Sequence, residues 1–333
     1  MSFHRIIPLG LLIFASAGSG IEVSFVSTTA AVCTVDGSQV TVVGPGTCSI
    51  VASQMGNAIY MAAPNVTQSF QVTSIKPSEA GIFRTNFEWL LDANGNRQFD
   101  GTGAGKDYVY FNFIAAQTGD VPVVGDWSGS GTTKIGVYRP SSGQWFLDFN
   151  GNGIFDSGDR EYNFGGLAGD KPVVGDWSGS GTSKIGIFRS GFFWLLDANG
   201  DGMFDGGDLA FAYGGVPGDV PVAGDWTGDG IAKVGIVRPF QTGGTPALWI
   251  LDANNDRTID TGDLFFAFGG IAGDMPVVGD WNGTGFAKAG VFRQGFYWVV
   301  DNNGSAAVFP GSSQLAAFAF GGIAGDVPIT GRW

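Results

Sequence analysis

The nine residues GDVPVVGDW at 119–127 decide the fold, because close copies of them recur along the chain. The copies are GDKPVVGDW at 169–177, GDVPVAGDW at 218–226, GDMPVVGDW at 273–281 and GDVPITGRW at 325–333. Their final tryptophans follow one another at intervals of 49 to 55 residues. A period in this range is typical of arrays built from one small supersecondary unit per repeat.

Each complete repeat has the pattern of four short strands. In the first one, PVVGDW is a strand, KIGVYR is the second, GQWFLDFN is the third and EYNFGG is the fourth, with Gly-, Ser- and Asp-rich turns between them. Alternation of β-branched, aromatic and small residues favours strands, and no stretch has a helical period. We therefore expect an all-β region without helices.

The two ends of the array complement each other. Residues 79–113 match strands two to four with no first strand before them, whereas residues 325–333 supply a first strand with nothing after it. Together they would complete one more sheet and leave no exposed edge. The sequence predicts a five-bladed β-propeller over 79–333, closed by the C-terminal strand. An open β-solenoid is the alternative, and it gives no reason for the complementary ends.

A reversal of charge marks the two chain ends. Four copies have an aspartate before the tryptophan and a lysine eight residues later, but the last copy has Arg332, and the aligned N-terminal position is Glu79. Like charges side by side would destabilise a strand pair. We expect strand 327–332 to lie antiparallel to strand 80–84, with an ion pair between Arg332 and Glu79.

Residues 21–73 form a separate module, followed by a short linker at 74–79. The module contains the only two cysteines, Cys33 and Cys48, on either side of an expected hairpin. A pair of this kind predicts a disulfide and an oxidising compartment, and two reduced buried thiols are the alternative.

Residues 1–20 have two interpretations. An apolar run from Ile6 to Phe14 before Ala15-Ser16-Ala17 is typical of a signal peptide, but the same residues could supply the first strand of the module. The run is too short to span a membrane. Both interpretations predict a secreted or cell-surface protein.

The repeat FGG-x-x-GD-x-PVVGDW-x-G-x-G-x-x-K-x-G-V-x-RP resembles the FG-GAP/VCBS-type repeats of bacterial extracellular proteins, over about residues 79–333. The resemblance implies a propeller. Residues 21–73 resemble bacterial surface immunoglobulin-like domains, which implies a small β-sandwich-like module. Such repeats hold calcium in the turn after the first strand, but this sequence has a lysine in place of the last carboxylate ligand. We expect a direct Asp–Lys ion pair there, as between Asp126 and Lys134.

The loops before the fourth strands carry the clearest chemical signal. They have oxygen-bearing side chains at loop positions 1, 3, 5, 9 and 12 and a backbone carbonyl at position 7, which is the spacing of calcium loops. The candidate calcium ligands are Asp148, Asn150, Asn152, Ile154, Asp156 and Asp159; Asp197, Asn199, Asp201, Met203, Asp205 and Asp208; and Asp252, Asn254, Asp256, Thr258, Asp260 and Asp263.

Two departures weaken this pattern. Arg257 replaces the glycine at position 6 of the third loop, and a fourth loop at 92–103 is partial because Gly103 occupies its last position. An ordinary Asx/Gly turn is the alternative for each loop. Three aligned copies nevertheless favour calcium as a bound cofactor.

The repeat also contains rings of tryptophan and arginine. Trp89, Trp145 and their equivalents could stack on sugars if they were exposed, but packing between sheets is the favoured interpretation. For Arg84, Arg139 and their equivalents we expect structural bonds to carboxylates or backbone.

Composition disfavours several functions. The net charge of −13 disfavours nucleic-acid partners, and the single histidine, His4, leaves no histidine for catalysis in the repeats. Glutamate occurs only at positions 22, 79, 88 and 161, and no repeat has an unusual polar cluster. We therefore expect no catalytic residues and a non-catalytic binding or adhesion role, toward an extracellular glycan or a surface protein. A polysaccharide-degrading glycoside hydrolase or lyase is the alternative, and a hydrolase would need a pair of carboxyl groups.

Overall fold

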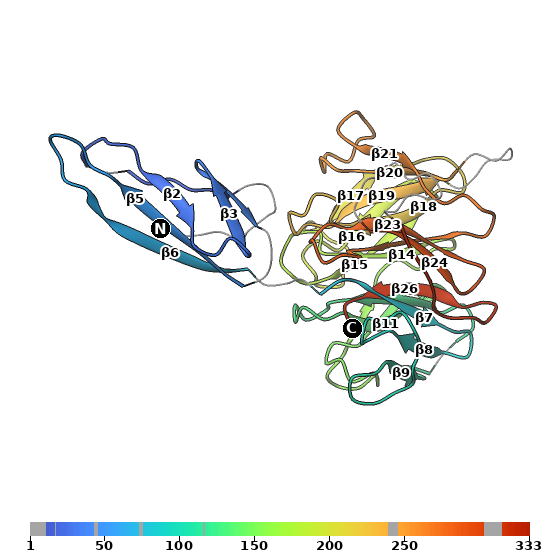
Figure 1. Ribbon diagram of the computed structural model, residues 1–333. Coiled ribbons are helices and arrows are strands. Elements are labelled where there is room, and N and C mark those ends of the chain that lie inside the picture. The colour runs from blue at the N-terminus through green and yellow to red at the C-terminus, as the bar shows by residue number, and fades with distance from the viewer. Residues whose placement is uncertain are drawn as a thin grey trace. The chain divides into compact units, whose positions relative to one another are not determined.

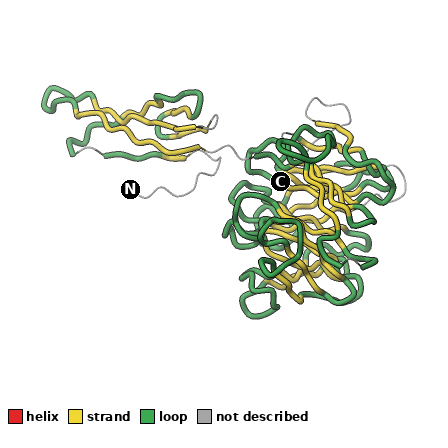
Figure 2. The backbone as a smooth tube through the Cα atoms, turned by 90° about the horizontal axis from the view of Figure 1, so that it is seen from below, coloured by secondary structure: helices red, strands yellow, loops and turns green. Residues whose placement is uncertain are grey.

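The structure is a computed structural model that describes residues 11–16, 18–42, 46–72, 76–115, 117–238, 246–302 and 315–333. These residues form strands, turns and loops without a helix (Figures 1 and 2). The described chain accordingly has no helix with the length and hydrophobicity of a membrane span. Two compact units divide the chain, Met1–Lys76 and Pro77–Trp333. The predicted all-β class is confirmed.

The first unit contains two three-stranded antiparallel sheets. One has the order β1-β4-β3, with β1 at Leu11–Leu12, β4 at Gln39–Val42 and β3 at Cys33–Asp36. The other has the order β2-β5-β6, with β2 at Ser24–Ser27, β5 at Gly46–Gln54 and β6 at Ala63–Val72. Leu11 and Leu12 pair with Val40 and Gln39 of β4. Residues 1–10 and 17 lie outside the described residues.

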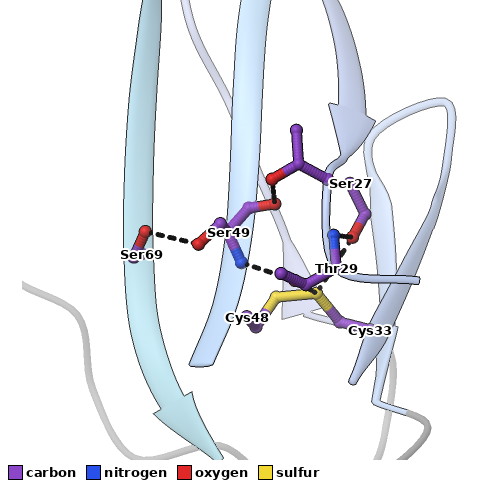
Figure 3. The surroundings of a disulfide bond; sticks show 7 residues. Ser27, Thr29, Cys33, Cys48, Ser49 and Ser69 are labelled. Atoms are coloured by element: carbon purple, nitrogen blue, oxygen red, sulfur yellow. Dashed lines mark hydrogen bonds between the residues drawn. A yellow bond between two sulfur atoms is a disulfide. The ribbon is translucent and has the colours of Figure 1, made fainter. Parts of the chain in front are cut away.

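A disulfide joins the two sheets of this unit. Cys33 on β3 and Cys48 on β5 are bonded, with Cα atoms 5.6 Å apart (Figure 3). Both are fully buried and pack with Val40 and Ile50 in the small core of the unit. The predicted disulfide is confirmed, and it replaces part of the apolar core that so small a unit cannot build.

The described residues of the second unit form five four-stranded antiparallel sheets. Four of them are continuous in sequence. The first has β10 (Val121–Gly125), β11 (Lys134–Arg139), β12 (Gln144–Leu147) and β13 (Arg160–Asn163). The next has β14 (Lys171–Gly175), β15 (Lys184–Arg189), β16 (Phe193–Leu196) and β17 (Leu209–Ala212). The third has β18 (Val220–Gly224), β19 (Lys233–Arg238), β20 (Leu248–Leu251) and β21 (Leu264–Ala267). The fourth has β22 (Met275–Gly279), β23 (Lys288–Arg293), β24 (Tyr297–Asp301) and β25 (Leu315–Ala319).

The remaining sheet combines both ends of the unit. Its order is β26-β7-β8-β9, with β26 at Val327–Gly331, β7 at Glu79–Phe83, β8 at Glu88–Leu91 and β9 at Tyr108–Phe111. The pairing of β26 with β7 is antiparallel, so the predicted strand pair is confirmed. We call this the composite sheet.

The ion pair predicted for Arg332 is wrong in its partner. Its Nη2 lies 3.1 Å from Oδ2 of Asp280, in the neighbouring sheet. Gly331 lies opposite Glu79 just as Gly125 lies opposite Lys134, so the strand register is that of the Asp–Lys pairs, and the difference is where the two side chains extend. The Glu79 carboxylate lies instead beside Gly95 in the loop of its own sheet.

Equivalent backbone hydrogen bonds connect each sheet to the next. In each, the N–H group of the residue just before a second strand donates to the carbonyl of the residue before the repeat tryptophan of a neighbouring sheet, at 2.8 to 2.9 Å. The bonds run from Thr133 to Arg332, Ser183 to Asp126, Ala232 to Asp176, Ala287 to Asp225 and Ser78 to Asp280. The first strands also contact one another in the same cyclic order, β10, β14, β18, β22 and β26.

Tryptophans form much of the core between the sheets. Those of the third strands, Trp89, Trp145, Trp194, Trp249 and Trp298, are at most 1% exposed. Trp127 and Trp145 of one sheet pack against Ile185 and Ile187 of the next. Packing between sheets, the favoured interpretation for these aromatics, is confirmed.

An arginine–aspartate pair recurs in every sheet. The arginine that ends or follows the second strand binds the aspartate of the GD-x-P motif just before the first strand. The pairs are Arg84–Asp326, Arg139–Asp120, Arg189–Asp170, Arg238–Asp219 and Arg293–Asp274. Burial alone would raise the pKa of Asp170, but the Arg189 guanidinium and nearby backbone N–H groups bring it below the usual value.

We predict that Asp170→Asn lowers the free energy of unfolding by about 2–3 kcal/mol at pH 7. A fully buried pair would lose about 3–5 kcal/mol, and the Arg189 side chain is 24% exposed. Because the folded-state pKa of Asp170 is lowered, its contribution is complete above the unfolded value near 3.8 and is lost as the pH falls through the folded value. Urea unfolding at a series of pH values should show the two proteins converging below pH 4. An equal difference at pH 7 and pH 2 would contradict this assignment.

Candidate functional site

The candidate calcium loops connect the third and fourth strands of the sheets. In the loop at 148–159, the first residue, Asp148, is 2% exposed and caps the turn. Its Oδ1 accepts the N–H groups of Gly151 and Asn152 at 2.7 and 3.1 Å, and its Oδ2 accepts that of Gly153 at 2.9 Å. Burial raises the pKa of Asp148, although these backbone bonds oppose the shift.

The last aspartate of this loop also faces backbone N–H groups. Oδ1 of Asp159 accepts from Phe149 at 2.8 Å, and Oδ2 accepts from Asp156 at 2.9 Å. The side chains at positions 3, 5 and 9 come together at the exposed side of the loop. There the Asn150 and Asn152 amide groups donate to the two carboxylate oxygens of Asp156 at 3.0 and 2.9 Å.

The loop at 197–208 repeats this arrangement. Asp197 accepts from Gly200 and Gly202, and Asp208 accepts from Ala198 and Asp205. At its exposed side, the amide nitrogen of Asn199 lies 3.0 Å from Oδ2 of Asp201 and 3.5 Å from Oδ1 of Asp205. Two carboxylates therefore converge on one donor group.

The loop at 252–263 keeps the same residues with looser bonds. Oδ2 of Asp252 accepts from Arg257 at 3.1 Å, and the Asn254 amide donates to Asp256 at 2.8 Å. Asp263 accepts from Asp260 at 3.4 Å and from the Tyr213 hydroxyl of the preceding sheet at 3.0 Å. Oδ1 of Asp260 binds the N–H group of Gly262.

For the residues predicted to supply a carbonyl ligand at position 7, the hydrogen bonds described are those of their N–H groups. Those of Ile154, Met203 and Thr258 each donate to the side chain at position 5 of their own loop, at 2.8 to 2.9 Å. This bond is the Asx turn that the alternative interpretation requires.

The partial loop has a last aspartate that the sequence spacing missed. Asp107, directly before β9, accepts the N–H group of Asp100 at 3.0 Å and is 1% exposed. It occupies the place that Asp159 has before β13, with four extra residues in the loop. The signal was an aspartate immediately before four of the five fourth strands, rather than a fixed count from the first aspartate.

A cation in these loops would be limited to one part of their surface. Among the described residues, no group of three or more His, Cys, Asp or Glu side chains is placed to hold a metal ion. The oxygens at positions 1 and 12 mainly serve backbone N–H groups, so the exposed residues at positions 3, 5 and 9 would have to bind it. In the second loop these are Asn199, Asp201 and Asp205, which offer hard oxygens of the kind that calcium prefers.

Position 6 of each loop is set by an aromatic residue on the fourth strand of the preceding sheet. Tyr110 lies against Gly153, where an added Cβ would be 2.2 Å from its ring. Tyr162 lies in the same way against Gly202. In two other loops, the aromatic residue is phenylalanine and position 6 is an arginine that stacks on it.

Two such stacking pairs are described. The guanidinium carbon of Arg257 is 5.1 Å from the ring centroid of Phe211, and that of Arg97 is 4.9 Å from Phe318. Arg257 has a φ of 67° and Arg97 a φ of 63°, so both adopt the left-handed conformation of the glycines that they replace. Arg257 in the third loop therefore packs on Phe211 and keeps the backbone conformation that glycine has at position 6 of the first two loops.

Lysine occupies the turns after the first strands. Lys134 Nζ lies 2.8 Å from Oγ of Ser128, 2.7 Å from Oγ of Ser130 and 3.4 Å from Oδ1 of Asp126. The turns with Lys184, Lys233 and Lys288 repeat the pattern. The expected Asp–Lys pairs are confirmed, and the ammonium group sits among oxygens of the kind that would otherwise surround a cation.

We predict that Gly153→Ala lowers the free energy of unfolding by about 2–4 kcal/mol, because a Cβ would both strain the backbone at φ 74° and strike Tyr110. Gly131→Ala is the matched control, since its φ is 85° but nothing lies within 4 Å of the added atom. The control should lose only about 1–2 kcal/mol. If chemical denaturation shows equal losses of unfolding free energy for the two variants, the Tyr110 ring does not restrict the residue at position 153.

Comparison with known proteins adds no family to this description. No family model matches the chain. No curated protein is similar to it by sequence.

Proposed function

We propose that this chain is a non-catalytic binding or adhesion protein, secreted or held at the cell surface. Its five sheets would form a closed five-bladed propeller of the FG-GAP/VCBS type, preceded by an immunoglobulin-like, sandwich-like module. The observation that carries the architecture is the cyclic set of hydrogen bonds between sheets, in which Thr133 donates to Arg332 of the composite sheet. Full closure would leave no first strand without a neighbour.

The use of charged groups favours binding over catalysis. The arginines of the second strands and the lysines of the turns bind carboxylates of their own repeats. The glutamates that do not repeat are engaged as well, since Glu88 binds Arg84 at 2.9 Å and Glu161 binds Gln144 at 2.9 Å. A hydrolase site would need a pair of carboxyl groups held apart across a substrate cleft.

The disulfide between Cys33 and Cys48 supports an extracellular location, because such bonds persist in oxidising compartments. Extracellular calcium is also abundant enough to fill weak sites. We propose that the loops at 148–159, 197–208 and 252–263 bind calcium in the range of about 10⁻⁴–10⁻³ M and that the ion is structural.

Calcium should stabilise the folded protein. At 10 mM, one site in this affinity range adds about 1.4–2.7 kcal/mol by mass action, so the melting temperature should rise relative to that in chelator. Asp201→Asn with Asp205→Asn should reduce the response, because each asparagine keeps an oxygen for its Asx bond but loses the charge. Asp229→Asn is the control, since Lys233 fills that turn. A melting temperature unaffected by calcium in the wild-type chain would refute these sites.

The function itself is tested by a binding screen. We expect the protein to bind an immobilised extracellular polysaccharide or surface protein, measured by surface plasmon resonance, and to release no reducing sugar or unsaturated product from the same material. Turnover that is lost in Glu88→Gln or Glu161→Gln would instead establish an enzyme.

A further inference from the structure

A second kind of site lies where the composite sheet meets the next sheet. A cavity of about 260 Å³ opens between β9 and the loop at 148–159. Its lining includes Tyr108, Tyr110, Thr132, Lys134, Asp148 and Asn150. The volume is below the roughly 300–1,000 Å³ of sites for drug-sized ligands, so it suits a single ring.

Tyr108 gives this cavity an aromatic wall that the corresponding positions of the other sheets lack. Tyr108 lies opposite Leu91 on the third strand. The residues in the same register are Arg160, Leu209, Leu264 and Ala316. Its side chain is 46% exposed, and its ring centroid lies 6.2 Å from that of Tyr110. An exposed aromatic face in a concave setting can stack on the apolar face of a sugar ring.

Tyr110, next to Tyr108 in the lining of the cavity, is fixed by packing. Its ring lies on Gly153 of the loop at 148–159, so it cannot move into the cavity without leaving that contact. A tyrosine hydroxyl keeps its proton at neutral pH, because its ordinary pKa is about 10. A protonated phenol can both donate and accept a hydrogen bond.

The charges at the cavity favour a neutral ligand. The two charged lining residues are Lys134 and Asp148, which have opposite signs. Each is compensated within the protein, Lys134 by Asp126 and two serine hydroxyls, and Asp148 by three backbone N–H groups. Neither charge therefore calls for a counter-ion on the ligand. At the exposed rim, the Thr132 hydroxyl lies 2.9 Å from that of Ser130 and the Asn150 amide donates to Asp156, and each group has a further hydrogen-bonding position for a ligand.

We propose that this cavity binds one neutral sugar residue of a glycan, which stacks on Tyr108 and exchanges hydrogen bonds with Tyr110, Thr132 and Asn150. The proposal rests on the binding function proposed above and assigns it a ligand class and a place. It also predicts one preferred site at the composite sheet rather than five equivalent ones.

The test is ligand-detected NMR of the full chain with neutral methyl glycosides of glucose, galactose, mannose, fucose and N-acetylglucosamine. At least one should receive saturation from the protein, and Tyr108→Ala should weaken its binding by about tenfold or more, as loss of the stacking face requires. Tyr108→Phe should keep most of the affinity. Phe111→Ala is the matched control, because Phe111 is on the same strand and 58% exposed but does not line the cavity.

The outcomes separate the site from the function. If the wild-type chain binds a glycoside and Tyr108→Ala binds it equally well, the cavity is not the site, although glycan binding stands. If Phe111→Ala also weakens binding, the effect is not specific to the cavity and the assignment fails. If the wild-type chain binds none of the glycosides, the proposal is overturned, and the screen of polysaccharides and surface proteins decides the general function independently.

Discussion

The antiparallel pairing of β26 with β7 is the constraint on which the Pro77–Trp333 unit depends. It brings together residues far apart in the chain, and the Arg84–Asp326 ion pair across it spans 242 positions. Without β26, the edge of β7 would be open, and the Thr133 N–H group would lose its acceptor on Arg332. The same pairing also buries Ile329 and Trp333 against Ile135 and Val137 of the next sheet. Local strand propensity cannot replace such a contact, because each sheet buries its faces against its neighbours.

Repetition made most of this fold predictable from the sequence. Five copies of GD-x-P and G-D/R-W predicted the strands, a structural role for the arginines and the composite sheet, since one pattern had to be satisfied five times. What failed depended on relations that a linear pattern does not contain. The partner of Arg332 belongs to the neighbouring sheet, where the Asp280 carboxylate lies 3.1 Å from the guanidinium group. Asp107 was missed because of a four-residue insertion, and Arg257 was misjudged because Phe211, its stacking partner, belongs to another sheet.

The two sets of Asp-rich turns satisfy their oxygens in different ways. After the first strands, a lysine ammonium group lies among oxygens of neighbouring polar side chains. For one of these lysines, Lys288, burial lowers the pKa. In the loops before the fourth strands, backbone N–H groups donate to the buried aspartates. The exposed carboxylates accept hydrogen bonds from asparagine amides and from backbone N–H groups in Asx turns. Because the lysine ammonium group is part of the chain, the first set of turns needs no cation from solution. The second set has no such charge, and an external cation would stabilise it more.

Symmetry within the repeat also limits where chemistry can differ. A residue that appears in every sheet is under the same packing demand five times, as the buried tryptophans and the Arg–Asp pairs show. The composite sheet escapes part of this demand, because its first strand and its second strand are not joined by a turn. There the lysine becomes Glu79, the aspartate becomes Arg332 and the fourth strand begins with Tyr108 in place of an arginine or leucine. An array of near-identical sheets gains a distinct surface most readily where strands from its first and last repeats share one sheet.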